Sequence, residues 1–257
     1  MPTRQFSDGL VIHGDFMDSG VQAVIAKAIG SQRFALTIAD PPYGNILNVY
    51  WDRIKASDRT FVGWMLDWTR MIQNVSHDRS AFYCWGGIGR PGFRPFYRYL
   101  LDVEEFTKYR LANHITWSKK RGYGIQHNYL FTREECAYFT LGDIKQPRCF
   151  HVPLLDEKRG YEGYDKDYPA KSEYLRRTNV WRDVTEIMRG KDHEAQKPLR
   201  VIEIPIEVHT KPGELVLDPF AGSGVTALAA RKLGRRFVVV EQDEHWFKYI
   251  CKALEAS

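Results

Sequence analysis

Short apolar runs and apolar residues at helical spacing alternate through the first part of the chain. Residues 34–39 (FALTIA) are an almost uninterrupted apolar run of strand length that ends at Asp40, which is typical of a buried strand. Residues 60–75 carry apolar side chains at helical spacing, so we expect a helix there. Further strand-like runs lie at residues 80–85, 113–117 and 137–141. This alternation of strands and helices predicts an α/β fold.

The C-terminal part of the chain has a stronger pattern. Lys197 and Pro198 are expected to open a helix, which Pro205 should kink or interrupt because proline has no N–H donor. The pattern then predicts a strand at 214–218, a helix entered through glycine at 223–233, a strand at 236–241 and a helix at 243–254. This order is typical of a nucleotide-binding βαβ unit, so we predict a Rossmann-like, doubly wound mixed sheet.

A polar stretch at residues 142–192 separates these two parts. It is rich in Tyr, Lys, Arg, Asp and Gly and has little periodicity, so we expect an inserted loop region that recognises a target. The chain then consists of residues 1–141, the insert at 142–192 and residues 193–257, with the first and third parts forming one domain.

The composition fits a globular protein. A chain of 257 residues with 44% hydrophobic residues is long enough for one α/β domain with a full core. No apolar run reaches the roughly 18 residues of a spanning helix, and the first ten residues (MPTRQFSDGL) contain no apolar signal core. We therefore expect a soluble, cytoplasmic protein. The four cysteines have no zinc-site spacing, so we expect reduced thiols and no metal.

The net charge of +5 permits a polyanionic partner without proving one. Basic residues are interleaved with aromatic residues over 108–133, and a second basic stretch covers 166–189. Such interleaving suits phosphate contact together with base stacking, although a solvated charged face would have the same composition. The candidate DNA-binding residues are Lys119, Lys120, Arg121, Arg176 and Arg177.

A glycine-rich turn connects the predicted strand at 214–218 to the helix after it. In the run DPFAGSG, Gly222 and Gly224 allow a sharp turn and close approach of a ligand to the backbone. The run lacks both GxGxxG and the GK[ST] of a P-loop, which disfavours a pyrophosphate site. Glu241 ends the next predicted strand, where an acid can accept hydrogen bonds from both hydroxyls of a ribose.

The tetrapeptide Asp40-Pro41-Pro42-Tyr43 directly follows the predicted strand at 34–39. Two prolines fix two φ angles and remove two N–H donors, so the segment is stiff and presents acceptors. The Asp40 carboxylate and the Pro41 carbonyl suit an –NH₂ group, which has two donors. Tyr43 offers an aromatic face to a planar ring. We predict Asp40, Pro41, Pro42 and Tyr43 as catalytic residues.

These motifs together resemble the amino-methyltransferases of DNA in the permuted beta arrangement. In that family a (D/N/S)PP(Y/F/W) motif precedes the FxGxG cofactor motif, as DPPY at 40–43 precedes FAGSG at 220–224 here. Ile12-His13-Gly14-Asp15 resembles the early "GD" segment, 178–181 the "NVW" segment, and 193–198 (HEAQKP) the "HxxQKP" segment. The resemblance implies a class I methyltransferase fold with circularly permuted motif order, S-adenosylmethionine as cofactor, and methylation of a base flipped out of duplex DNA. It also makes a homodimer an open expectation.

The resemblance assigns the cofactor a place over the glycine turn. Glu241 would hold its ribose, Asp15 and Gln242 would approach its adenine or sugar, and Lys197 would help to place its methionine end. The residues expected to bind the cofactor are Asp15, Asp40, Lys197, Asp218, Phe220, Ala221, Gly222, Ser223, Gly224, Thr226, Glu241 and Gln242.

Adenine N6 is the expected target because Asp before PPY is commoner in the adenine enzymes of this family and Ser in the cytosine enzymes. Cytosine N4 is the first alternative. Methylation of RNA is a second, and a non-catalytic nucleic-acid-binding domain of the same fold is a third. The recognised base sequence is not readable from residues 142–177.

Overall fold

The computed structural model describes residues 1–44, 57–87, 89, 92–124, 126–159, 172–185 and 196–257. Within these ranges the strands are β1 (Thr3–Gln5), β2 (Gly9–His13), β3 (Phe34–Ala39), β4 (Ser76–Gly86), β5 (Tyr109–Tyr123), β6 (Phe131–Leu141), β7 (Leu154–Lys158), β8 (Tyr174–Arg176), β9 (Val180–Trp181), β10 (Leu215–Asp218) and β11 (Arg236–Glu241). The helices are α1 (Ser19–Ile29), α2 (Asp58–Val75), α3 (Pro95–Phe106), α4 (Leu199–His209), α5 (Val225–Lys232) and α6 (Glu244–Glu255).

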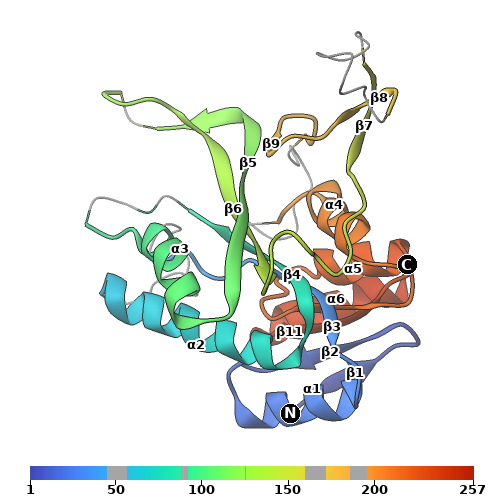
Figure 1. Cartoon of the computed structure of the whole chain (residues 1–257). Coiled ribbons are helices and arrows are strands. Elements are labelled where there is room, and N and C mark those ends of the chain that lie inside the picture. The colour runs from blue at the N-terminus through green and yellow to red at the C-terminus, as the bar shows by residue number, and fades with distance from the viewer. Residues whose placement is uncertain (45–56, 88, 90–91, 125, 160–171, 186–195) are drawn as a thin grey trace.

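One mixed sheet forms the centre of the molecule, with the strand order β1-β2-β11-β10-β3-β4-β6-β5-β9 (Figure 1). Strands β2, β11, β10, β3 and β4 are parallel, whereas β6 is antiparallel to both β4 and β5. The two strands made last, β10 and β11, therefore lie between β2 and β3. The ends of β3 and β10 consequently meet at one edge of the sheet, the carboxyl edge of its parallel strands.

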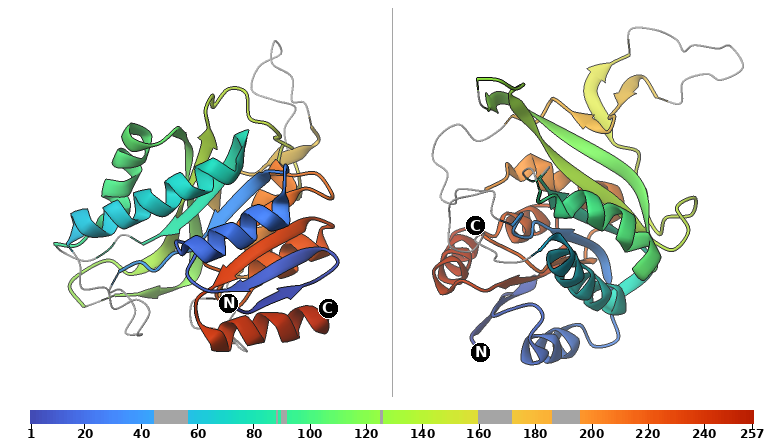
Figure 2. Two further views of the ribbon diagram at one scale, coloured as in Figure 1. Left: turned by 90° about the horizontal axis from the view of Figure 1, so that it is seen from below. Right: turned by 90° about the vertical axis from the view of Figure 1, so that its left-hand side faces the viewer.

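Helices cover both faces of this sheet (Figure 2). Buried residues of α1, α2 and α3 pack on one face in a core that includes Val21, Trp68 and Tyr99. Buried residues of α4, α5 and α6 pack on the other, with Ile204 and Ile250 among them. The burial of both sheet faces explains why β3 is apolar along its length. The predicted doubly wound α/β fold is confirmed.

Side-chain caps fix the start of several helices. Asp243 accepts hydrogen bonds from the backbone N–H groups of His245 and Trp246, at 2.7 and 3.3 Å, and so begins α6 just after β11. Ser57 caps α2 by accepting from the N–H of Thr60 at 3.2 Å. Such caps satisfy N–H groups that have no partner within the helix.

Two hairpins extend from the same end of the molecule, at the top of Figure 1 and of the right-hand view of Figure 2. Pairing of β4 with β6 stops at Gly86 and Glu135, whereas pairing of β5 with β6 continues to Tyr123 and Phe131. The β5–β6 hairpin therefore reaches beyond the carboxyl edge of the sheet. The second hairpin consists of β7 and β8.

The structure changes the predicted elements in three places. The insert at 142–192 contains strands β7, β8 and β9 in its described part, so it is not loop throughout. The helix at 223–233 begins only at Val225, because Gly224 has a left-handed backbone with a φ of 81°. Strands β5 and β6 continue well past the apolar runs at 113–117 and 137–141, into charged sequence whose cross-strand pairing supplies the hydrogen bonds.

Of the predicted kink or interruption at Pro205, the interruption is wrong. Helix α4 begins at Leu199 rather than at Lys197, and it continues through Pro205 to His209. Most of its residues are buried, including Val201, Ile204 and Ile206. Burial of these side chains offsets the one hydrogen bond that a proline removes.

No helix in the described ranges is both long and apolar enough to span a bilayer. The four cysteines are Cys84, Cys136, Cys149 and Cys251, and all are free thiols. The first two are buried, which raises their pKa well above the usual range.

Candidate active site

The DPPY segment and the glycine turn lie at the ends of two adjacent parallel strands. Strand β3 pairs with β10 so that Thr37 is level with Leu217, and Asp40 and Phe220 follow these strands at the same edge. Burial, together with the carboxylates of Asp40 and Glu241, raises the pKa of Asp218 to about 7. The two motifs, distant in sequence, thus contribute to one cluster of carboxylates.

The buried Asp218 carboxylate stabilises the glycine turn through two hydrogen bonds. It accepts these bonds from the Phe220 N–H at 2.9 Å and from the Thr226 hydroxyl at 2.5 Å. Asp218, Ser223 and Thr226 are all buried. The ring of Phe220 packs on Trp68 of α2, with centroids 5.2 Å apart. These contacts fix the shape of the turn.

Gly222 and Gly224 give the turn its left-handed backbone, with φ angles of 52° and 81°. The N–H of Ala221 donates to the Val240 carbonyl at 2.9 Å, which ties the turn to β11. A Cβ on Gly224 would lie 2.8 Å from the side chain of Ile250, so α6 could not pack as it does against any larger residue.

Glu241 joins the end of β11 to this turn. Its carboxylate accepts from the Gly222 N–H at 2.6 Å and from the Asp243 N–H at 2.8 Å. Burial raises the pKa of Glu241, although these backbone donors lower it in part. Asp15 follows β2, the neighbour of β11, and accepts from the Met17 N–H at 2.8 Å. The ring of His13 donates to the Gln242 carbonyl at 3.1 Å. Asp15 and Gln242 therefore lie at adjacent strand ends beside Glu241.

Within the described residues, the Asp40 carboxylate bonds to Tyr43 and Lys197, both of them predicted site residues whose pairing with Asp40 the sequence did not indicate. The hydroxyl of Tyr43 donates to Oδ1 of Asp40 at 2.9 Å, and the ammonium of Lys197 pairs with Oδ2. The same ammonium lies 3.3 Å from the Tyr43 hydroxyl. Burial and the nearby carboxylates, chiefly that of Asp40, raise the pKa of Tyr43 well above its usual value, so it is a neutral donor.

Lys197 is buried among aromatic and acidic groups. Its side chain is only 5% exposed, and its ammonium lies 4.8 Å from the centre of the Trp85 ring. The carboxylate of Glu134 is 3.4 Å away. Sequence reasoning did not identify Trp85 or Glu134. Strand alternation separates Glu134 from Glu135 onto opposite faces of β6, but nothing in the local pattern indicates a lysine 63 positions later.

The β5–β6 hairpin carries three of the predicted DNA-binding residues. Lys119 pairs with Glu134, and its side chain is 19% exposed. Lys120 and Arg121 are exposed. The hairpin therefore presents two basic side chains toward solvent beyond the carboxyl edge, while Lys119 lies closer to the carboxylate cluster.

The other two predicted DNA-binding residues differ from each other. Arg176, at the end of β8, is exposed and lies 5.8 Å from the ring of Phe150. Arg177 is turned inward: it pairs with Asp183 at 2.5 Å and is 6% exposed.

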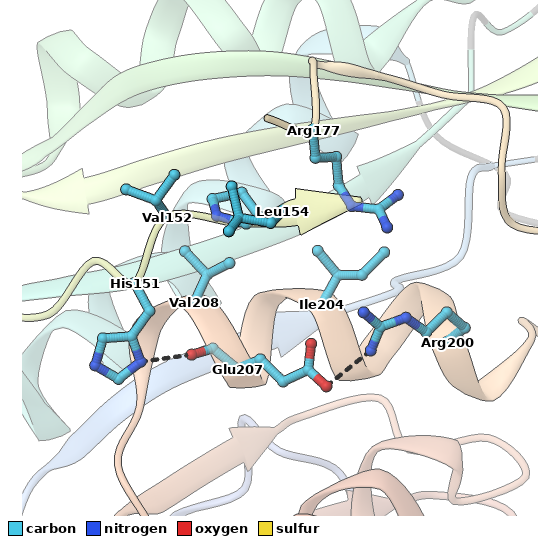
Figure 3. A pocket seen from close by; sticks show the side chains of 9 residues that line it. His151, Val152, Leu154, Arg177, Arg200, Ile204, Glu207 and Val208 are labelled. Carbon is cyan, nitrogen blue, oxygen red and sulfur yellow. Dashed lines mark hydrogen bonds and ion pairs between the residues drawn. The ribbon is translucent and has the colours of Figure 1, made fainter. Parts of the chain in front are cut away.

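Arg177 faces a small pocket between the segment at 151–154 and α4 (Figure 3). In this pocket Arg200 pairs with Glu207 at 2.8 Å, and the His151 ring donates to the Glu207 carbonyl at 3.0 Å. The pocket is lined by His151, Val152, Pro153, Leu154, Arg177, Arg200, Ile204, Glu207 and Val208. None of these belongs to the DPPY segment or to the glycine turn.

Within the described ranges, no group of three His, Cys, Asp or Glu side chains could hold a metal ion. Of the segments with family resemblance, His193, Glu194 and Ala195 fall outside the described residues.

Comparison with known proteins agrees with this geometry. A family model described as DNA methylase (N6_N4_Mtase) matches residues 34–252. The chain is 41% identical to "Putative methylase YubD" of Escherichia coli (strain K12) over 213 residues, which cover 82% of this chain and 77% of that protein. It is 25% identical over 276 residues to "DNA adenine methyltransferase YhdJ" of the same organism, covering 100% of this chain and 86% of that protein.

Among solved structures, the chain is similar in fold to PvuII DNA methyltransferase (cytosine-N4-specific). The TM-score is 0.68 at 15% identity, over 96% of this chain and 86% of that chain. The match at residues 34–252 covers both the DPPY segment and the glycine turn. The chain therefore belongs to the N6_N4_Mtase family of DNA methylases.

Proposed function

We propose that this protein transfers a methyl group from S-adenosylmethionine to the N6 amine of an adenine flipped out of DNA. The observation that carries the proposal is the position of the Asp40 carboxylate, at the end of β3 and beside the glycine turn at the end of β10. This arrangement puts an acceptor for an amine next to a turn suited to a nucleoside.

The residues around the turn fit a ligand that combines an amino acid, a ribose and an adenine. Glycines at 222 and 224 leave the turn without side chains at two left-handed positions. Each oxygen of Glu241 accepts one backbone N–H and retains a lone pair for a ribose hydroxyl. Asp15 and Gln242 would lie near the adenine or sugar. When bound, S-adenosylmethionine supplies an electrophilic methyl group on a sulfonium.

The chemistry of this chain is mainly one of positioning. The lone pair of the adenine amine is delocalised into the ring, which makes it a poor nucleophile. Asp40 and the Pro41 carbonyl would accept its two N–H bonds and draw the nitrogen toward tetrahedral geometry. Correct positioning is worth roughly 7–11 kcal/mol in well-oriented reactions. The same fixed acceptors stabilise the positive charge that develops on the nitrogen.

The base must leave the duplex before its amine can reach Asp40. Flipping costs a few kcal/mol, and stacking on an aromatic ring returns about 1–3 kcal/mol. Tyr43 would supply this ring. Its hydroxyl bond to Asp40 would hold ring and carboxylate in a fixed relation. Lys120, Arg121 and Arg176 would contact DNA phosphates.

Transfer of a tritiated methyl group tests the proposal. Duplex DNA, single-stranded DNA and RNA are offered in parallel, and nucleoside analysis of the product distinguishes N6-methyladenine from N4-methylcytosine. We expect N6-methyladenine in duplex DNA. Labelled RNA alone, or N4-methylcytosine, would contradict the proposed substrate.

The variant Asp40→Ala tests the role of the carboxylate. We expect its turnover to fall by at least about 1,000-fold, since it loses both an acceptor and a charge. Its affinity for S-adenosylmethionine in calorimetry should fall far less, because Asp40 is only one of the residues expected to bind the cofactor. Asp67→Asn is the control, because Asp67 pairs only with Arg70 on the surface of α2 among its described contacts. Near-native methylation by Asp40→Ala would contradict the mechanism.

A homodimer would extend the basic surface across two chains. It is a prediction from the resemblance, and sedimentation velocity with and without DNA measures it directly.

A further inference from the structure

Four charged side chains of alternating sign lead from the base of the β5–β6 hairpin to Asp40. Lys119 pairs with Oε1 of Glu134, Oε2 of Glu134 lies 3.4 Å from the Lys197 ammonium, and that ammonium pairs with Oδ2 of Asp40. Glu134 lies on β6, Lys197 lies two residues before α4, and Asp40 directly follows β3. The series exists only in the folded protein.

Lys197 depends on both carboxylates. Burial alone would lower its pKa, but the charges of Asp40 and then Glu134 more than offset burial, so the pKa lies above the usual value for lysine. The ammonium is almost fully enclosed and makes cation–π contacts with Trp85 and Tyr43, at 4.8 and 5.8 Å from the ring centres. The position of such a buried ammonium is determined by the carboxylates that pair with it.

Glu134 therefore affects how strongly the Lys197 ammonium pairs with the Asp40 carboxylate. With both carboxylates present, the ammonium shares its charge between them. Without the charge of Glu134, the ammonium would pair with Asp40 alone, and its full positive charge would oppose the charge that develops on the methylated amine. The Asp40 carboxylate would then be a weaker acceptor for that amine.

We propose that Glu134 is a positioning residue of the methyl transfer, which acts through Lys197 to keep the Asp40 carboxylate available to the substrate amine. The proposal rests on the function proposed above. Glu134 does not touch the substrate in this scheme. It affects the rate of transfer and leaves the binding of both substrates nearly unchanged.

The chain supplies a matched control in the next residue. Glu135 lies on the same strand but faces the other side of the sheet, and its side chain is 3% exposed against 21% for Glu134. Its partners are Arg133 at 2.8 Å, His114 at 3.2 Å and the Thr116 hydroxyl at 2.9 Å. Glu134→Gln and Glu135→Gln thus each remove one negative charge from the same strand. Glu134 faces Lys197, whereas Glu135 faces the opposite side of the sheet.

The experiment measures kcat, KM for S-adenosylmethionine and Kd for duplex DNA in both variants. For Glu134→Gln we expect kcat to fall about ten-fold or more, the scale of one electrostatic contact, with KM and Kd within about three-fold of wild type. For Glu135→Gln we expect a lower melting temperature and a kcat within about two-fold of wild type. A wild-type kcat in Glu134→Gln, or equal losses of kcat in both variants, would overturn the proposal.

A double-mutant cycle with Lys197→Met tests whether Glu134 acts through Lys197. In the Lys197→Met background, Glu134→Gln should lower the single-turnover rate by less than about two-fold. A loss as large as in the wild-type background would overturn the proposal. If Glu134→Gln does not fold, Glu134→Met replaces it, because it also removes the charge, and a wild-type kcat in that variant overturns the proposal.

The failure of this proposal differs from the failure of the proposed function. A correctly folded wild-type chain that methylates no DNA would contradict both. An active wild type with an unaffected Glu134→Gln variant would contradict only the role of Glu134.

Discussion

Gly224 joins β10 to α5 through a backbone conformation that few other residues adopt. Its φ of 81° is in the left-handed region, and an added Cβ would lie 2.8 Å from Ile250 of α6. Gly234 also has a left-handed φ, of 70°, but an added Cβ there would meet nothing within 4 Å. The two glycines separate the cost of the backbone conformation from the cost of a steric clash.

We expect Gly224→Ala to lower the free energy of unfolding more than Gly234→Ala. The left-handed conformation costs an alanine about 1–2 kcal/mol at either position, and the clash with Ile250 adds about 1–3 kcal/mol at Gly224 alone. Urea denaturation of both variants measures the difference. Equal losses would show that α6 accommodates the methyl group without cost.

At this scale the sequence predicted residue types better than their partners. Asp40, Gly222 and Glu241 lie at a strand end or in the turn after it, and a sequence motif indicates each of them. The pairing of Lys197 with Asp40 could not be predicted, because it joins residues 157 positions apart through a fold. The burial of Arg177 could not be predicted either, because a run of basic residues does not indicate which of them pairs with a carboxylate.

Among the elements, α4 is joined to the start of the insert partly through a buried histidine. His209, at the end of α4, donates through Nδ1 to the Cys149 carbonyl at 3.0 Å, and its Nε2 accepts from the Tyr83 hydroxyl at 3.0 Å. The bond from the Tyr83 hydroxyl requires the neutral ring, because a protonated Nε2 cannot accept a hydrogen bond. Burial lowers the pKa of His209 to about 4.

This histidine predicts a loss of stability in mild acid. Because its folded pKa lies below the ordinary value of about 6.5, the unfolded chain binds the proton more readily as the pH falls from about 6.5 toward 4. His209 should therefore cost about 2 kcal/mol of unfolding free energy between pH 7 and pH 5. His209→Gln, whose amide can still donate and accept, should lose that much less over the same interval in urea titrations. Identical pH dependence in the two proteins would contradict the buried, neutral state.

Element types were predictable wherever the apolar period was clear, as in β3, β10 and α6. The ends of other elements were not, because hydrogen bonds rather than burial determine them. Strand β5 continues to Tyr123 through a charged run that contains no apolar period. Helix α4 passes Pro205 because tertiary burial outweighs one lost hydrogen bond.

For the whole molecule, basic side chains project from the end that carries the two hairpins. Lys120 and Arg121 are exposed on β5, beyond the carboxyl edge of the sheet. Lys27 is exposed in the last turn of α1, which lies at the opposite end of the molecule in Figure 1. This difference in position makes Lys27 a control for non-specific charge effects.

We expect the double variant Lys120→Ala/Arg121→Ala to bind duplex DNA about 10- to 100-fold more weakly at 0.1 M salt and to reduce the slope of log K against log salt by about 2. Its affinity for S-adenosylmethionine should be unchanged. Fluorescence anisotropy over a salt series measures both quantities for DNA. Lys27→Ala should match wild type, and an equal loss in Lys27→Ala would contradict a binding face at the hairpin end.

The strand order has a consequence for the synthesis of this protein. Strands β2 and β3 are made early, yet their partners β11 and β10 leave the ribosome last and insert between them. Until then, the nascent chain exposes two strand edges that can pair with other chains, so its early half depends on protection from aggregation. The carboxylate cluster also cannot assemble before Glu241 has emerged. A nascent chain without β10 and β11 therefore has neither the glycine turn nor Glu241 beside Asp40.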